Sequence, residues 1–328
     1  MVEGASSAVT LNLRMPEISV VVPAYNAARY LAQTLESLCA QTLRSWELIV
    51  VDDGSSDDTM VIARHFALRD ERISFRQQPN TGVAAARNAG LFAASPDAWA
   101  IMFLDADDVL EPNALAALSA ALRAHPSAVG AHGQVRFIDD EGRPIRVGEA
   151  EAWGRERRAL VDGKIVDWPP HLPTTLAVLI LLNRMRTPGC VLLRRALVES
   201  LGGFDPDPRA AIAEDYLLWL RLACRGDFVF LDQLVLAYRL HEQNASGNLR
   251  KTDVARWYVH RKLATGEDVT EEQRELLKQG LRYARLLGSR DWFSWSKDSL
   301  RKRRLFVAAN QGRHALVELL HFYLDRSA

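Results

Sequence analysis

The sequence lacks long hydrophobic runs and has few cysteines. Its longest apolar stretch, residues 176–182, is far shorter than the roughly 20 residues that a membrane-spanning helix needs. No apolar segment follows a basic start, so we expect no secretory signal, and residues 1–15 should form a flexible tail. Cys39, Cys190 and Cys224 are widely spaced in apolar surroundings, which is typical of small buried hydrophobes and not of a disulfide framework or zinc site. These features predict a soluble protein of a reducing, cytoplasmic compartment.

A net charge is also missing. The 41 Lys and Arg residues balance the 41 Asp and Glu residues, so the whole chain has no electrostatic bias toward nucleic acid or an anionic membrane. With 328 residues, of which 48% are hydrophobic, the chain can form one large or two smaller globular domains.

Strand and helix patterns alternate along the first half of the chain. Strands are expected at 18–22, 46–51, 73–76 and 100–104, and helices at 27–40, 57–68 with Asp57 as N-cap, 83–93 and from 111 onward. Later segments suggest strands at 129–139, 189–193, 228–231 and 234–238, and helices at 176–183, 211–225 and from 252 to the end. Residues 140–170 are poorly periodic. The alternation predicts an α/β fold with a mainly parallel sheet flanked by helices.

Polar residues follow three of these strands directly, at Pro23–Tyr25, Asp52–Gly54 and Asp105–Asp107. Ligands of parallel sheets bind at the carboxyl ends of strands, so we expect these residues to meet at one edge. Asp105 and Asp107 would lie on the same side if the chain stayed extended, and two carboxylates suit Mg²⁺ or Mn²⁺. A simple turn is the alternative.

Six segments together carry a resemblance to a known family. They are residues 21–26 (VVPAYN), 50–59 (VVDDGSSDDT), 80–90 (NTGVAAARNAG), 103–108 (FLDADD), 202–205 (GGFD) and 214–221 (EDYLLWLR). In order and spacing they resemble the inverting family 2 glycosyltransferases, which have the GT-A fold, a mainly parallel Rossmann-like sheet flanked by helices. The likeness covers residues 16–245.

The resemblance implies a role for each matching residue. The residues implied to bind the nucleotide sugar are Pro23, Tyr25, Asp53, Arg87, Asp105 and Glu214. The residues implied to hold the metal are Asp107, Asp105 and, more weakly, His241. The implied catalytic base is Asp215. Each has a plainer alternative. Asp53 could be a turn residue, Tyr25 a core residue, Arg87 part of a surface salt bridge, Asp215 a first-turn carboxylate and His241 a surface histidine. Asp108 is expected to be a helix cap or a group that supports the ligands.

The implied activity is transfer of one sugar from a UDP- or dTDP-sugar to a hydroxyl acceptor, with Mn²⁺ or Mg²⁺ bound. The acceptor would be a saccharide, a lipid-linked molecule or another hydroxyl compound, in cell-surface polysaccharide or glycoconjugate synthesis. The Gln-x-x-Arg-Trp motif of processive relatives is absent, since Asp253 stands where Gln would precede Arg256-Trp257, so single addition is expected. A nucleotidyltransferase, or a sugar-nucleotide-binding protein without turnover, remains the alternative.

The resemblance also suggests how the chain is divided. Residues 16–130 would bind the nucleotide sugar, residues 131–245 would hold the acceptor and the base, and residues 246–328 would form a helical extension. Trp153 and Trp168 could stack on a sugar or pack in the core. Trp292, Phe293 and Trp295 lie near the basic run 301–304 and suggest peripheral membrane contact, with a packed helical tail as the alternative.

Overall fold

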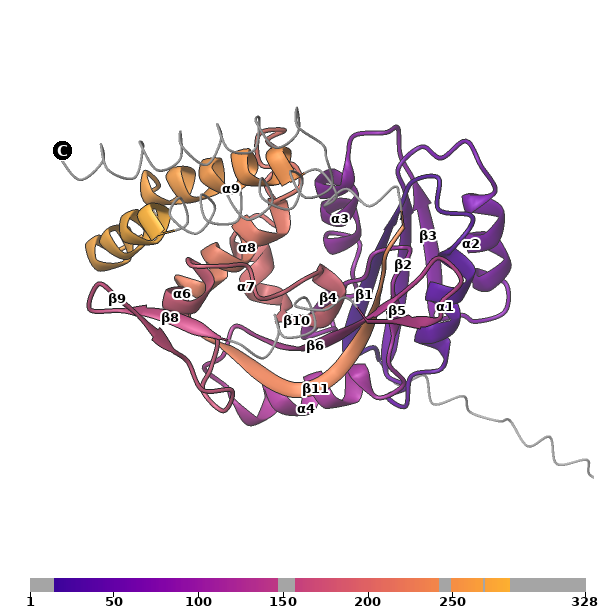
Figure 1. Ribbon diagram of the computed structural model, residues 1–328. Coiled ribbons are helices and arrows are strands. Elements are labelled where there is room, and N and C mark those ends of the chain that lie inside the picture. The colour runs from indigo at the N-terminus through magenta and orange to yellow at the C-terminus, as the bar shows by residue number, and fades with distance from the viewer. Residues whose placement is uncertain (1–14, 147–156, 242–248, 268, 284–328) are drawn as a thin grey trace, which may run out of the picture.

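A curled nine-stranded sheet organises the structure (Figure 1). The computed structural model describes residues 15–146, 157–241, 249–267 and 269–283. The strands follow the order β3-β2-β1-β4-β10-β6-β11-β5, and β7 pairs with β6. The predicted tail at 1–15 (apart from Met15), Trp153 and the Trp292–Arg304 segment lie outside the described residues.

The first half of the sheet is parallel, as the alternation predicts. Its elements are β1 (Ile18–Ala24), α1 (Leu31–Cys39), β2 (Trp46–Asp52), α2 (Thr59–Ala67), β3 (Ile73–Gln77), α3 (Val83–Leu91) and β4 (Ala100–Phe103). β1 pairs in parallel with both β2 and β4, and β2 pairs in parallel with β3. α1 and α2 lie on one side of these strands and α3 on the other (Figure 1). Asp58 directly precedes α2 and makes no capping bond with its side chain, whereas the carboxylate of the predicted cap, Asp57, accepts the backbone N–H of Thr59 at the start of the helix.

The second half of the sheet is mixed. Its elements are β5 (Val109–Leu110), α4 (Ala114–Ala124), β6 (Gly130–Ile138), β7 (Pro144–Ile145), the short 3₁₀ helix η1 (Pro188–Cys190), β10 (Val191–Arg194), α7 (Arg195–Ser200), α8 (Glu214–Ala223) and β11 (Phe228–Arg239). β10 runs antiparallel to both β4 and β6, and β11 pairs in parallel with β6. The two strands predicted at 228–231 and 234–238 are one strand, because irregular pairing between Phe230 and Leu236 lets β11 continue past the polar Asp232 and Gln233.

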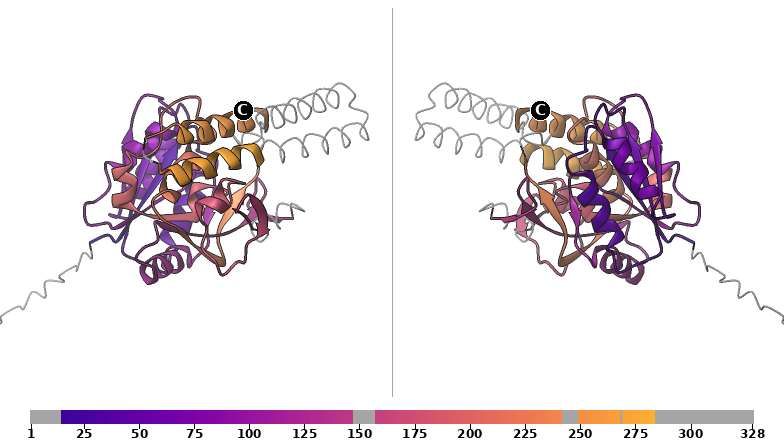
Figure 2. Two further views of the ribbon diagram at one scale, coloured as in Figure 1. Left: turned by 90° about the vertical axis from the view of Figure 1, so that its left-hand side faces the viewer. Right: turned by 90° about the vertical axis from the view of Figure 1, so that its right-hand side faces the viewer.

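Three smaller pieces complete the fold. β8 (Arg158–Val161) and β9 (Lys164–Asp167) form a hairpin inside the region that lacked periodicity. The predicted helix at 176–183 is only the single turn α6 (Leu176–Leu179). α9 (Leu249–Ala264) and the helical residues 271–283 lie beside α8, and the views of Figure 2 show that they stand on the far side from α1 and α2. No helix in the described part of the chain is both long enough and apolar enough to span a membrane.

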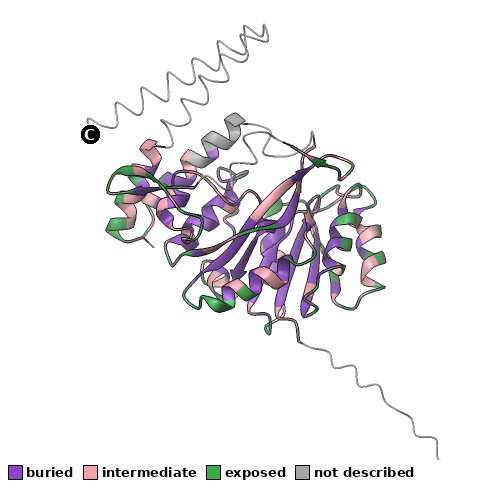
Figure 3. Cartoon of the chain, turned by 60° about the horizontal axis from the view of Figure 1, so that its bottom comes forward, coloured by how far each residue is buried: buried purple, intermediate pink, exposed green. Residues whose placement is uncertain are grey.

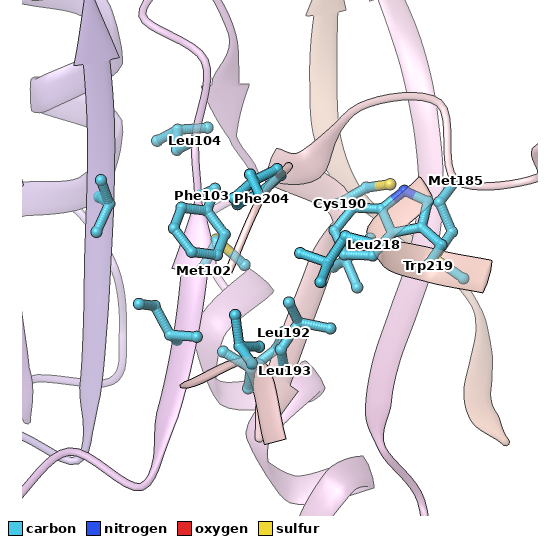
Figure 4. Close-up of a cluster of buried hydrophobic side chains, with 14 of the residues drawn as sticks. Met102, Phe103, Leu104, Met185, Cys190, Leu192, Leu193, Phe204, Leu218 and Trp219 are labelled. Carbon is cyan, nitrogen blue, oxygen red and sulfur yellow. The ribbon is translucent and has the colours of Figure 1, made fainter. Parts of the chain in front are cut away.

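One continuous hydrophobic core fills the space between the sheet and its helices. The central strands β1, β2, β4 and β10 are buried along most of their length (Figure 3). Where the parallel and antiparallel halves meet, Phe103 of β4 packs edge-on against Phe204, with ring centroids 4.7 Å apart, and Trp219 of α8 covers the second half (Figure 4). Cys190 is fully buried in this core, and all three cysteines are free thiols.

Candidate functional site

A cleft of about 400 Å³ opens where β1 and β4 end, facing the start of α8 and the end of β11. It collects eight of the nine residues singled out from the sequence, namely Pro23, Tyr25, Arg87, Asp105, Asp107, Glu214, Asp215 and His241. The ninth, Asp53, lines an adjoining pocket of about 350 Å³. Pro23, Tyr25 and Val83 line both spaces, so the two hollows join along the carboxyl edge of the sheet.

Arg87 connects two carboxylates from distant parts of the chain. Its Nη1 donates to Glu214 Oε1 at 2.7 Å and its Nη2 to Asp105 Oδ1 at 2.8 Å. The Arg87 side chain is only 5% exposed, so this is a buried ion-pair network and not the surface salt bridge that the sequence left open. Burial alone would lower the pKa of Arg87, but Asp105 and Glu214 outweigh it and raise that pKa. Phe204 supports the guanidinium from 5.1 Å.

Asp105 and Asp107 lie in a turn after β4 and not in an extended segment, so the alternation expected from strand geometry does not apply. Both still line the cleft, because the turn directs them to the same edge of the sheet. His241, which follows β11, meets Asp107 with Nε2 2.8 Å from Oδ2, across 134 residues of sequence. The sequence could not show this contact, since it depends on β11 pairing alongside β6.

Thr187 is a site residue that the sequence patterns did not reveal. Its hydroxyl lies 2.9 Å from Asp105 Oδ2 and 3.1 Å from Asp108 Oδ2. Asp108 is completely buried and also accepts the backbone N–H of Arg239, so it supports the turn and caps no helix. Burial, together with the charges of Asp107 and Asp105, raises the pKa of Asp108 well above its usual range. A Thr before Pro188-Gly189 gave no signal for this role, because the contact forms only when η1 packs beside the turn.

Glu214 and Asp215 begin α8, where a helix N-terminus favours negative charge. Glu214 is buried and its Oε2 has no hydrogen-bond partner among the described residues, whereas Asp215 is partly exposed and faces the cleft. Burial, with the neighbouring charge of Glu214, raises the pKa of Asp215 to about 8. A carboxyl that titrates near neutral pH can take up a proton during a reaction, which an ordinary surface carboxylate does poorly.

Asp53 is held by the chain segment that follows β3. Its Oδ1 accepts the N–H of Thr81 at 2.9 Å and the side-chain amide of Gln78 at 2.8 Å, and its Oδ2 accepts the N–H of Gly82 at 2.8 Å. Gly82 has φ of +93°, which favours glycine at this point. Oδ2 has one donor in the described structure and a carboxylate oxygen accepts more than one, so it can also take a donor from a ligand in the adjoining pocket.

Tyr25 is 55% exposed at the mouth shared by both hollows, so it does not pack in the core. The neighbouring Asn26 joins the loops after β1 and β2: its N–H donates to Ser55 Oγ, and its side chain accepts the N–H of Ser56, each at 2.9 Å. This cross-link fixes the backbone beside Tyr25 and leaves the exposed ring where a planar ligand can stack.

The donor set fits a divalent cation bound together with a diphosphate. No group of three or more His, Cys, Asp or Glu side chains within the described ranges is placed to hold a metal alone. The Asp107–His241 pair offers one carboxylate oxygen and one imidazole nitrogen at the cleft wall. Mg²⁺ and Mn²⁺ sites of phosphate-binding enzymes use one or two such protein ligands and complete the shell with phosphate oxygens and water.

Comparison with known proteins decides the family. The model of glycosyl transferase family 2 matches residues 19–202, more than half of the chain. The chain belongs to this family. The curled α/β sheet of this family 2 chain is the GT-A fold predicted from the sequence.

Two relatives are similar to this chain over most of its length. The family 2 chain is 28% identical to chondroitin synthase of Escherichia coli over 243 residues, which are 74% of this chain and 31% of that protein. It is 30% identical to an uncharacterized protein of Mycobacterium tuberculosis, over 84% of this chain and 80% of that one. It thus spans about a third of the length of the chondroitin synthase.

Two solved structures share the fold. Residues 1–349 of S. aureus TarS, in complex with UDP-GlcNAc, superpose with a TM-score of 0.62 at 20% identity and cover 91% of this chain and 81% of that one. The mannosyltransferase PcManGT from Pyrobaculum calidifontis, in complex with GDP-Man and Mn²⁺, gives a TM-score of 0.58 at 18% identity, over 93% of this chain and 87% of that one. At these identities the likeness establishes the fold.

Proposed function

We propose that this family 2 enzyme is a metal-dependent inverting glycosyltransferase that moves one sugar from a UDP- or dTDP-sugar to a hydroxyl acceptor. The arrangement that carries the proposal is the joined pair of hollows. One contains Asp53 together with the exposed ring of Tyr25, and the other contains the Asp107–His241 pair, the Arg87 network and Asp215. Such an order suits a ligand with a base at one end, a diphosphate in the middle and a sugar at the other end.

The nucleotide end is assigned to the smaller hollow. Asp53 Oδ2 accepts the imide N–H of a uracil or thymine ring, and Tyr25 stacks on that ring. Both bases carry this N–H, whereas cytosine lacks it, which is why we favour UDP and dTDP donors. The TarS structure with UDP-GlcNAc supports the proposal for the donor class.

The diphosphate is assigned to the Asp105–Asp107 turn. Asp107 and His241 would hold Mn²⁺ or Mg²⁺, and the bound cation would supply positive charge to the leaving diphosphate. The Mn²⁺ complex of PcManGT supports this part of the proposal. Arg87 keeps Asp105 in place and contributes a fixed positive charge behind the turn, and Glu214, which lines the cleft, is assigned to a donor-sugar hydroxyl.

Asp215 is the proposed base. It takes the proton from the acceptor hydroxyl as that oxygen forms a bond to the anomeric carbon, and the bond from that carbon to the diphosphate breaks on the opposite face, which inverts the configuration. The raised pKa of Asp215 allows its carboxylate to accept the proton of the acceptor hydroxyl near neutral pH.

The acceptor would be a saccharide, a lipid-linked molecule or another hydroxyl compound of cell-surface glycoconjugate synthesis, and one sugar would be added at each encounter.

A panel of nucleotide sugars tests the donor and metal assignments. Binding of UDP-, dTDP-, GDP- and CDP-sugars is measured by calorimetry with Mn²⁺ and again with EDTA, for the unmodified enzyme and for Asp107→Ala. We expect tight binding of uracil or thymine donors only with the metal, and at least a tenfold weakening in Asp107→Ala. Equal binding of all four bases would contradict the role of Asp53. Unchanged binding by Asp107→Ala would contradict the metal site.

A further inference from the structure

Tyr30, at the start of α1, has its ring against the imidazole of His241. The two ring centroids are 4.9 Å apart and the planes meet at 29°, which is a stacked arrangement. Tyr30 also lines the cleft that contains Asp107 and Asp215. Tyr30 lies in the helix predicted at residues 27–40, and the proposed reaction assigns it no role.

Other groups fix the Tyr30 ring in this position. The phenol O–H donates to Asp140 Oδ1, and Asp140 is ion-paired with Arg29 at 2.7 Å. The guanidinium of Arg239 lies 4.9 Å from the ring centroid and that of Arg29 lies 5.2 Å from it. Burial and the hydrogen bond to Asp140 raise the pKa of Tyr30, so the phenol remains a donor throughout the neutral range.

Arg239 in turn is anchored to the turn that carries the acidic residues. It is almost completely buried, its Nε donates to the carbonyl of Asp107 at 2.8 Å, and its Nη1 donates to the carbonyls of Asp139 and Asp140. Arg239 is the last residue of β11 and His241 follows it by two positions, and both side chains contact Tyr30. Asp107, Arg239, Tyr30 and His241 therefore form one connected unit.

We propose that Tyr30 is a positioning residue for the metal site: its ring restricts rotation of the His241 imidazole and keeps Nε2 directed at Asp107 Oδ2. This inference rests on the proposed metal role of His241. A histidine imidazole can rotate about two side-chain bonds, and a cation between Asp107 and His241 needs Nε2 on the Asp107 side. The stack supplies that orientation before any cation binds.

The test measures Mn²⁺ binding directly. The full chain is titrated with Mn²⁺ at saturating UDP, and free Mn²⁺ is followed by electron paramagnetic resonance, for the unmodified enzyme, His241→Ala, Tyr30→Leu and Tyr30→Phe. Tyr30→Leu should weaken Mn²⁺ binding about tenfold, as expected when a residue that orients a metal ligand is lost. Tyr30→Phe, which keeps the ring, should remain within about twofold of the unmodified enzyme. Circular dichroism spectra should be equal in all four proteins, which shows that they are folded.

The possible failures are distinguishable. If His241→Ala weakens Mn²⁺ binding and Tyr30→Leu does not, Tyr30 has no positioning role and the proposed function stands. If His241→Ala binds Mn²⁺ normally, the histidine is no ligand and the role of Tyr30 fails with it. If the unmodified enzyme binds no Mn²⁺, the metal dependence in the proposed function is wrong. If Tyr30→Leu does not fold, Tyr30→Met replaces it and is judged by the same criteria. If Tyr30→Phe loses as much Mn²⁺ affinity as Tyr30→Leu, the phenol O–H matters and the stacked ring does not.

Discussion

Arg87 is a buried cation whose two terminal nitrogens donate to different carboxylates. The arrangement ties α3 to the turn after β4 and to the first residue of α8. A buried ion pair is expensive to break, because the partner that remains is a desolvated charge. Arg87 therefore serves the stability of the cleft as much as its electrostatics.

Replacing Arg87 should accordingly be costly in free energy of unfolding. Arg87→Met leaves the buried Glu214 and the partly exposed Asp105 without their cation, and we expect a loss of about 3–5 kcal/mol in urea unfolding. A matched control is Arg123→Met, which removes an ion pair with Glu17 whose side chains are 52% and 42% exposed. That control should lose less than about 1 kcal/mol. Equal losses in the two variants would contradict a buried network at Arg87.

The pKa of Asp215 sets the pH dependence of transfer. A general base must be deprotonated, and a carboxyl with a pKa of about 8 is mostly protonated at pH 7 in the free enzyme. Hence kcat/KM should rise as the pH increases and reach a plateau above about 8. Initial rates at limiting donor between pH 5.5 and 9.5, with circular dichroism at each pH as the folding control, check this. A flat profile, or a single limb near pH 4, would contradict the raised pKa.

The loop between α7 and α8 is the element that carries Phe204 to its place under Arg87. The side-chain amide of Asn88 donates to the carbonyl of Phe204 and accepts its N–H, each at 2.8 Å. Gly203 lies directly against this contact: it has φ of +77°, and a Cβ there would clash with Asn88 Oδ1. The Gly-Gly-Phe-Asp segment of the family pattern thus has a structural reason in this chain.

Two adjacent glycines offer a matched pair of variants. Gly202 has φ of +74°, and a Cβ added there would have no atom within 4 Å, so Gly202→Ala costs only backbone strain, about 1–2 kcal/mol. Gly203→Ala adds the displacement of Asn88 to that strain, and we expect a loss of at least about 3 kcal/mol in thermal or urea unfolding. If Gly203→Ala were no worse than Gly202→Ala, the Asn88 contact would have no structural importance.

Elements with strong local patterns could be predicted from the sequence, and the others could not. β1, β2 and β4 are apolar runs between turn residues, so both their existence and the polar residues at their ends were evident. β8 and β9 have only four residues each, and β10 is antiparallel in a sheet expected to be parallel. Short strands and strand direction depend on pairing with distant partners, which a local pattern does not encode.

At the scale of the whole molecule, sheet topology explains which site residues could be found in advance. The polar ends of parallel strands lie at one edge of the sheet. The order of the strands alone therefore predicted that Pro23, Asp53 and Asp105 would lie close together. Thr187, Tyr30 and the network of Arg239 came from segments with no polar signature, and they reach the cleft because η1, α1 and β11 pack against the same turn. The sequence predicted the candidate ligands and missed the residues that hold them.

The sheet is continuous from β3 to β5, so the half predicted to bind the nucleotide sugar and the half predicted to hold the base share one core. This continuity permits Asp107 of one half to meet His241 of the other, and Arg87 to meet Glu214. The donor and the acceptor can therefore both bind at the same continuous sheet. In the proposed function, Asp215 lies between them.

The most direct measurement compares Asp215→Asn with the unmodified enzyme, using the donor identified by the panel and its acceptor. Asparagine keeps the size of the side chain and cannot accept the proton as a carboxylate does. Sugar transfer should fall by at least about a hundredfold, the size of a general-base contribution, while donor affinity measured by calorimetry stays within about twofold. Normal transfer by Asp215→Asn, at unchanged donor affinity, would contradict Asp215 as the base and with it the proposed mechanism.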